Sequence, residues 1–265
     1  MSKKLNSLVL DLLGRINESN EIINWSSPVI SFGDLLNSKV ATLGLNPSNR
    51  EFVDSNGMEL EGGDRRFHTL KSLGISKWSD VSESHLMLIR ESCQKYFDIN
   101  PYDKWFKSLD FLLSGTNASF YSDVNNACHL DLIPFATEKK WSQLKNEQKS
   151  ELLELSGDIL GRLLKESNIQ ILILNGVTVV DVLQSISDAK FEKNEINSWN
   201  LPRKSGIDVK GVSYRGIMSN VSGVELTKEI NVFGFNHNIQ SSFGVTNEVK
   251  LSIQSWIKKV YKELI

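Results

Sequence analysis

VATLGLNPSNREF, residues 40–52, is the stretch that decides the fold of this chain. Its apolar residues stop at Gly44 and pass into a polar turn, a pattern that predicts a short buried strand. The ring of Pro47 biases Asn46 toward an extended backbone, so Asn46 follows the carboxyl end of that strand. In an open α/β sheet this is where ligands bind. Taken alone, however, the stretch favours a plain turn, because Asn, Pro and Ser are common turn residues.

Composition narrows the class of protein. The chain has 265 residues, of which 40% are hydrophobic and 23% charged, as in an ordinary globular protein, and we expect one domain over residues 1–265. Because the net charge is only −2, any nucleic-acid binding must come from a local patch. The two cysteines are too few for a disulfide framework. With neither a signal peptide nor a membrane-length apolar run, we expect a cytoplasmic monomer that does not bind membranes.

Strands and helices alternate along the chain. Apolar runs predict strands at 40–45, 123–132, 169–174 and 230–235. Helical spacing appears at about 4–18, 82–97, 103–113, 145–167, 177–186 and from 246 onward. We expect helical additions at about 1–38 and 66–115, and a β-like, hairpin-like insertion at about 190–220. This alternation predicts a parallel sheet.

Polar residues follow each predicted strand: Asn46; Asn126 to Asp131; Asn175; and Asn236 to Asn238. The carboxyl ends of parallel strands lie at one edge of a sheet. We therefore expect these clusters to converge around one crevice.

Four motifs in this order resemble the uracil-DNA glycosylase superfamily. They are TLGLNPS (42–48), DVNNACH (123–129), ILILNG (171–176) and FNHNIQSS (235–242). The first is similar to the first motif of the single-strand-selective and mismatch-specific branches. NPYDKWF (100–106) is similar to helical segments of uncharacterised members. The chain departs from the pattern because Pro and Ser do not follow His237, and because the second motif continues into His129-Leu130-Asp131. Two cysteines also exclude the iron–sulfur branches.

The resemblance implies a fold and a reaction. The fold is a three-layer α/β/α domain with a central four-stranded, mainly parallel sheet. The reaction is monofunctional hydrolysis of the N-glycosidic bond of a flipped base in DNA, which leaves an abasic site and needs no metal or organic cofactor.

Three residues are candidates for catalysis. Asn46 can accept a hydrogen bond from a water and fix its line of attack on C1′, and its alternative role is to cap a turn. Glu51 can act as a general base on the same water, and its alternative is a solvated loop charge. His237 can donate to the carbonyl oxygen of the departing base, and its alternative is a locally bonded loop histidine.

The remaining candidates would bind the base or the DNA. Phe52 can stack on a flipped base or pack in the core. Asn126, His129 and Asp131 can bind the base edge or satisfy neighbouring loops, and one residue of register decides which of them faces the pocket. Arg65, Arg66, Ser241 and Ser242 are candidate phosphate contacts, and Phe243 is a candidate wedge into the duplex. Further basic candidates are Lys139, Lys140, Arg203, Lys204 and Arg215.

The substrate is open between two pyrimidines. The Asp131 carboxylate would accept from the exocyclic amine of cytosine, which favours a modified cytosine such as phage DNA carries, and so a role in antiviral defence. The alternative is uracil, read by Asn126, with a role in DNA repair. A catalytically silent nucleic-acid-binding module on the same fold is the alternative from another class. An unrelated α/β hydrolase is disfavoured because the chain has no Gly-x-Ser-x-Gly elbow and no Walker A loop.

Overall fold

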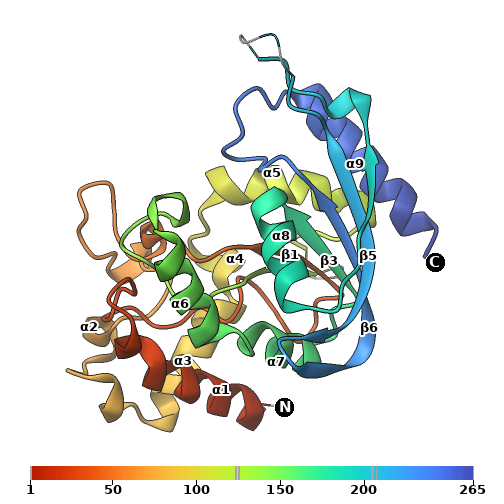
Figure 1. Cartoon of the computed structure of the whole chain (residues 1–265). Helices are drawn as coiled ribbons and strands as arrows, with labels where there is room; N and C mark the ends of the chain where they lie inside the picture. The colour runs from red at the N-terminus through yellow and green to blue at the C-terminus, as the bar shows by residue number, and fades with distance from the viewer. Residues whose placement is uncertain (1, 123, 125, 204–205, 207, 265) are drawn as a thin grey trace.

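The computed structural model describes residues 2–122, 124, 126–203, 206 and 208–264. It shows an α/β fold in which helices surround one mixed six-stranded sheet (Figure 1). The strands are β1 (Val40–Gly44), β2 (Ala127–Asp131), β3 (Ile171–Asn175), β4 (Glu192–Glu195), β5 (Val212–Val221) and β6 (Val224–Phe235). The helices are α1 (Ser2–Arg15), α2 (Leu70–Leu73), α3 (Glu83–Gln94), α4 (Tyr96–Ile99), α5 (Asp103–Leu113), α6 (Asn146–Ser156), α7 (Ile159–Glu166), α8 (Val177–Ile186) and α9 (Asn247–Lys262). Asp123 and Asn125 of the expected second strand, and the basic candidate Lys204, lie outside the described residues.

The sheet has the strand order β2-β1-β3-β6-β5-β4. Its first four strands are parallel neighbours, whereas β5 and β4 run antiparallel. The expected four-stranded sheet is therefore only part of the structure. In the expected β-like segment 190–220, β4 and β5 pair antiparallel and extend the sheet beyond β6. β5 and β6 run antiparallel because a tight turn at Ser222 and Gly223 joins them. The φ angles of these two residues, 48° and 80°, suit a two-residue hairpin.

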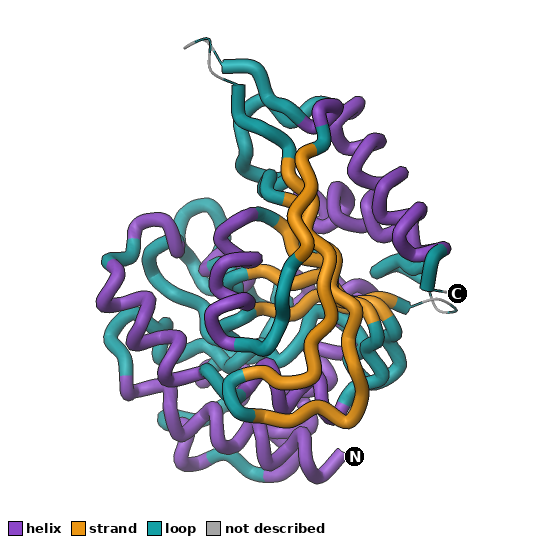
Figure 2. Tube along the Cα trace, turned by 45° about the vertical axis from the view of Figure 1, so that its right-hand side comes forward, coloured by secondary structure: helices purple, strands orange, loops and turns teal. Residues whose placement is uncertain are grey.

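Helices cover both faces of the sheet (Figure 2). On β6, Phe233 lies 6.1 Å, centroid to centroid, from Trp256 of α9. A Cβ atom added to the next residue, Gly234, would lie 3.2 Å from Val180 of α8. Since successive residues of a strand point to opposite faces, α9 and α8 cover opposite faces. Every residue of β1, β2 and β3 is buried, as expected for parallel strands with helices on both faces of the sheet.

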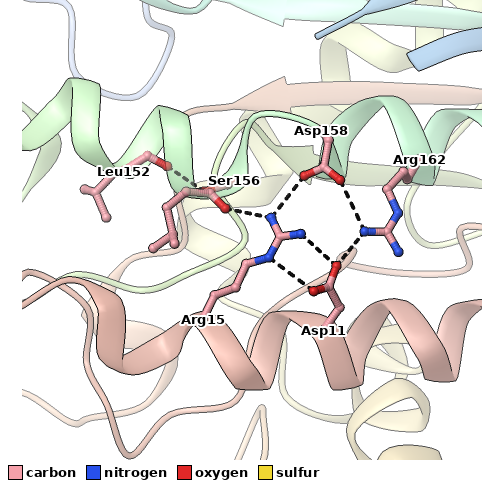
Figure 3. Close-up of polar contacts among 7 residues, drawn as sticks. Asp11, Arg15, Leu152, Ser156, Asp158 and Arg162 are labelled. Atoms are coloured by element: carbon pink, nitrogen blue, oxygen red, sulfur yellow. Dashed lines mark hydrogen bonds and ion pairs between the residues drawn. The ribbon is translucent and has the colours of Figure 1, made fainter. Parts of the chain in front are cut away.

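The expected helix over residues 145–167 is divided into α6 and α7 (Figure 3). The guanidinium of Arg15 on α1 donates to the backbone carbonyl of Leu155 over 2.8 Å. The hydroxyl of Ser156 donates to the carbonyl of Leu152 over 2.6 Å. Both contacts compete with the helical hydrogen-bond ladder, so the helix ends here. In the described part of the chain, no helix is long and apolar enough to cross a membrane.

Candidate functional site

The carboxyl ends of β1 and β2 meet at Gly44. Gly44 lies opposite Asp131 in the parallel register of the two strands. A Cβ atom on Gly44 would lie 2.4 Å from Asp131 Oδ1 and 2.9 Å from His129 Nε2. A side chain at this position would therefore collide with two polar groups. Glycine is required here by close packing, and its absent side chain gives Asp131 and His129 the space they occupy.

His129 on β2 contacts a polar side chain through each nitrogen of its ring, and the contact of Nδ1 links β2 to β1. Its Nδ1 is 2.7 Å from the hydroxyl of Thr42 on β1, and its Nε2 is 3.3 Å from Asp131 Oδ1. All three residues are buried. Because His129 and Asp131 are two residues apart on β2, they face the same side of the sheet. The ring of Trp105 on α5 packs 5.2 Å from the His129 ring and shields it from water.

Glu51 is a buried carboxylate beside this group. It ends a single 3₁₀ turn, Asn49–Glu51, which begins where the Ser48 hydroxyl accepts from the backbone N–H of Arg50 over 3.2 Å. Glu51 Oε2 accepts from the Tyr96 hydroxyl over 2.8 Å and lies 3.8 Å from Arg66 Nε.

Burial raises the pKa of Glu51 to about 7, against opposing contributions from Tyr96 and Arg66 and with an added contribution from the negative charge of Asp131. A carboxylate that titrates near neutral pH can take up a proton during a reaction. Glu51 is thus the described residue at this edge that is best suited to general base catalysis.

Asn46 is half-buried at the start of the loop that follows β1. Its Nδ2 donates to the Thr137 hydroxyl over 2.9 Å and to the carbonyl of Pro47 over 3.1 Å. These bonds fix the amide plane against the segment that follows β2. No described residue donates to its Oδ1, which is therefore able to accept from a water molecule.

Phe52 lies in the core, with 1% of its surface exposed. Its ring packs 6.2 Å from Trp25 and 5.7 Å from Phe67, centroid to centroid. This is the packed position that the sequence left open as the alternative to stacking on a base. A base therefore has no exposed Phe52 ring on which to stack.

His237 and Asn126 are not brought to this group. His237 is buried, and its Nε2 donates to the carbonyl of Trp199 over 2.7 Å. Burial lowers its pKa, and the bond to Trp199 opposes this. It follows β6, which β3 separates from β1. Asn126 precedes the first residue of β2 and bridges to Ser119, so it lies at the opposite edge of the sheet from Asp131.

The two arginines of the Arg-Arg pair differ in what they contact. Arg66 donates to the backbone carbonyls of Asn100 and Arg50, each over 2.8 Å, and its guanidinium lies 5.6 Å from the centre of the Tyr102 ring. Two of its five N–H groups are thus used by backbone carbonyls, one of them in the loop after β1. The side chain of Arg65 makes no hydrogen bond or ion pair with any described residue and is half-buried.

The loop after β6, blue in Figure 1, carries the remaining DNA-binding candidates. The side-chain oxygen of Asn238 accepts from the backbone N–H of Ser241 over 3.0 Å, and the Asn238 carbonyl accepts from that of Ser242 over 2.8 Å. The side chain of Phe243 is 72% exposed, and the guanidinium of Arg203 lies 5.6 Å from the centre of its ring. An exposed aromatic ring with a cation on its face can contact bases and phosphates together.

Sequence reasoning did not find two residues of the site. Thr42 could have been found, since it is the one hydroxyl within the apolar run of β1 and lies in register with His129. Tyr96 carries no local signal, because it reaches Glu51 only through folding of the segment after α3. No family model and no curated protein matches this chain.

Proposed function

We propose that this protein is a monofunctional DNA glycosylase that hydrolyses the N-glycosidic bond of a flipped pyrimidine. The observation that carries the proposal is the buried Glu51, with a pKa of about 7, beside Asp131 and the Asn46 turn at one edge of the sheet. The resemblance of four motifs to the uracil-DNA glycosylase superfamily supplies the substrate class. A three-layer α/β/α arrangement of that superfamily's type, with cytoplasmic location, belongs to the same proposal.

The chemistry assigns Glu51 and Asn46 different roles. Asn46 Oδ1 accepts a hydrogen bond from a water and directs it at C1′ of the flipped nucleotide. As the bond from C1′ to the base breaks, the water oxygen bonds to C1′ and its proton passes to Glu51. The electron pair of the broken bond leaves with the base, and an abasic site remains. Glu51 must be ionised to act, so activity should rise as the pH increases through about 7.

Asp131 supplies the specificity in this proposal. Its carboxylate accepts hydrogen bonds, and cytosine presents an exocyclic amino donor where uracil presents an oxygen. The favoured substrate is therefore a cytosine derivative, including the modified cytosines of phage DNA. Asn126, the reader proposed for uracil, lies at the other edge of the sheet, which weakens the uracil alternative.

DNA would contact the two loops that flank the site. Arg65 is the better phosphate contact of the Arg-Arg pair, because its side chain makes no hydrogen bond with a described residue, whereas Arg66 donates to two backbone carbonyls and lies 3.8 Å from Glu51. Phe243, whose side chain is 72% exposed, would enter the space left by the flipped base.

The test is release of bases from oligonucleotides that contain uracil, cytosine or 5-hydroxymethylcytosine, with alkali used to cleave abasic sites. Wild type should release the cytosine derivative. Asn46→Ala and Glu51→Gln should each lose about 10²-fold in rate or more, as for removal of one preorganised polar group, and should still bind DNA. Glu151→Gln, a change at an exposed position of α6, is the control and should keep full activity.

Two results would contradict the proposal. Absence of abasic sites from every oligonucleotide would favour the silent binding module. Full activity of both Asn46→Ala and Glu51→Gln would place the chemistry elsewhere in the molecule.

A further inference from the structure

We infer that the outer edge of β4 pairs with the same strand of a second copy of this chain, which makes the protein a weak two-fold dimer. β4 is the last strand of the sheet, and no strand pairs with its outer side in the part of the chain that the structure describes. All four of its side chains are exposed. An open strand edge presents unpaired N–H and C=O groups to which another strand can bond.

The first step is to find which backbone groups of β4 point outward. The N–H of Ile196 donates to the carbonyl of Gly211 over 2.8 Å, so these two residues form a hydrogen-bonded pair with β5. Such pairs alternate along an antiparallel ladder, and Asn194 therefore also directs its backbone groups at β5. The backbone groups of Lys193 and Glu195, which lie between these positions, point away from β5 and into the open edge.

The second step is the register of an antiparallel pair related by a two-fold axis. Outward backbone groups can bond only to the outward groups of the other strand, so the pair must be centred on Lys193, Asn194 or Glu195. Centring it on Lys193 or on Glu195 brings two like charges directly opposite each other, which is destabilising. Centring it on Asn194 places Lys193 of each copy opposite Glu195 of the other. Only this register satisfies both the backbone and the charges.

Asn194 would lie at the two-fold axis of this dimer. In the register centred on it, the two copies of Asn194 are a non-hydrogen-bonded pair, whose side chains are close together. A primary amide carries both donors and acceptors, so it can bond to a second copy of itself. In the single chain, Asn194 Nδ2 donates to Glu192 Oε1 over 3.1 Å at an exposed position, a contact that can exchange readily.

The charged side chains of β4 are held on one face of the sheet. The ammonium group of Lys193 lies 5.6 Å from the centre of the Tyr214 ring, and Glu195 forms an ion pair with Lys210 over 2.8 Å. Lys193 and Glu195 are two residues apart on a strand, so both side chains lie on the same face. Each is thus placed beside the strand edge that a second copy would meet.

The other face leaves room for a second strand. An open pocket of about 150 Å³ lies between β4 and α9, lined by Glu192 and Asn194 on the strand and by Trp256, Lys259 and Val260 on the helix. Because this pocket separates α9 from β4, a strand can approach the edge on this side.

The dimer edge and the proposed active site lie at opposite ends of the sheet. Strands β3, β6 and β5 lie between β4 and the pair of strands, β1 and β2, that positions Asn46 and Glu51. Pairing at β4 therefore leaves the proposed site uncovered. The inference does not rest on the proposed function, and its test needs no turnover.

Sedimentation of the full chain measures the dimer directly. Because a pair of four-residue strands is at the small end of interface sizes, we expect a dissociation constant on the order of 100 µM. The average mass should rise from 29.9 kDa toward twice that value as the protein is concentrated. It should fall again at high salt, which screens exposed ion pairs. A mass of 29.9 kDa that persists at ~500 µM protein and ~50 mM salt would establish a monomer and overturn the inference.

Charge reversal tests the register. Lys193→Glu and Glu195→Lys each place like charges opposite each other at both pairs, so each variant alone should dimerise at least about 10-fold more weakly than wild type. An equal mixture of the two variants restores opposite charges at both pairs and should form the heterodimer. The mixture contains the same chains as the separate samples, so altered contacts within a chain cannot explain the recovery. A mixture that associates no better than the separate variants overturns the inference.

Lys145→Glu and Glu147→Lys are the matched controls. They make the same charge changes two residues apart, at exposed positions near the start of α6. Each should dimerise as wild type does, alone and in the mixture. Loss of the dimer in these controls would show that net charge, and not the edge of β4, governs association.

A cross-link tests the position of the two-fold axis. The Cα atoms of the paired Asn194 residues would be about 4.5 Å apart, a separation that a disulfide can span. Asn194→Cys should therefore form a covalent dimer under a mild oxidant, while the two native cysteines are buried and do not interfere. In Lys193→Cys the two equivalent residues would be about 8 Å apart and should cross-link far more slowly. Equal rates for the two variants, or no covalent dimer of Asn194→Cys, would overturn this register.

Discussion

Replacement of Glu51 by glutamine should change how the stability of the protein depends on pH. The carboxyl of Glu51 has a pKa of about 7 in the folded chain, raised by burial, and its ordinary value is 4.5. Between these two values the folded chain binds a proton that the unfolded chain has lost. The free energy of unfolding contributed by this group is therefore highest below about pH 4.5 and falls as the pH rises through 7.

The size of the effect follows from the two pKa values. Their difference of about 2.5 corresponds to about 3 kcal/mol, an upper figure because the site relaxes when it ionises. Glutamine has the same shape and keeps an oxygen for the Tyr96 hydroxyl, but it has no proton to lose. Relative to wild type, Glu51→Gln should thus gain up to about 3 kcal/mol in unfolding free energy between pH 5 and pH 9.

Urea unfolding of both proteins at several pH values measures this difference, and every other titrating group cancels in the comparison. Glu151→Gln serves as the control, because its side chain is exposed and its difference from wild type should not change with pH. A difference between Glu51→Gln and wild type that stays constant from pH 5 to pH 9 would refute the reasoning. Glu51 would then not be the neutral-pH base of the site.

Four further substitutions test the packing of the molecule and its contact with DNA. Gly44→Ala should cost about 1–3 kcal/mol, visible as a lower melting temperature, because its Cβ would be 2.4 Å from Asp131 Oδ1; an unchanged melting temperature would contradict this. Arg66→Ala should cost about 2 kcal/mol in urea unfolding, since its guanidinium donates to two backbone carbonyls. Arg65→Ala should change the free energy of unfolding by less than about 0.5 kcal/mol. It should lower the slope of the salt dependence of DNA binding by about 1, as for the loss of one phosphate contact. Arg15→Ala should cost about 1 kcal/mol, a modest value because its ion pairs are partly exposed, and wild-type stability of that variant would show that the helix break does not depend on it.

The sequence by itself determined the parts of the fold that depend on local pattern. Buried parallel strands are continuous apolar runs, so β1 and β3 were found within a residue or two of their bounds. The amphipathic spacing of α5 placed it at Asp103–Leu113. Because parallel strands share one carboxyl edge, the sequence also located Asn46 and Asp131 at the same edge.

Tertiary structure decided what depends on contacts between distant residues. The division of α6 from α7 is favoured by Arg15, which lies 140 residues earlier in the chain than the carbonyl it contacts. The burial that makes Glu51 a candidate base comes from Tyr96 and its neighbours, and no periodicity near residue 51 reports it. Likewise, His237 lies at the expected edge of the sheet, yet its ring makes a hydrogen bond to the backbone carbonyl of Trp199. A sequence pattern records where the backbone goes, whereas the direction and charge of a buried polar side chain depend on the partners that folding brings to it.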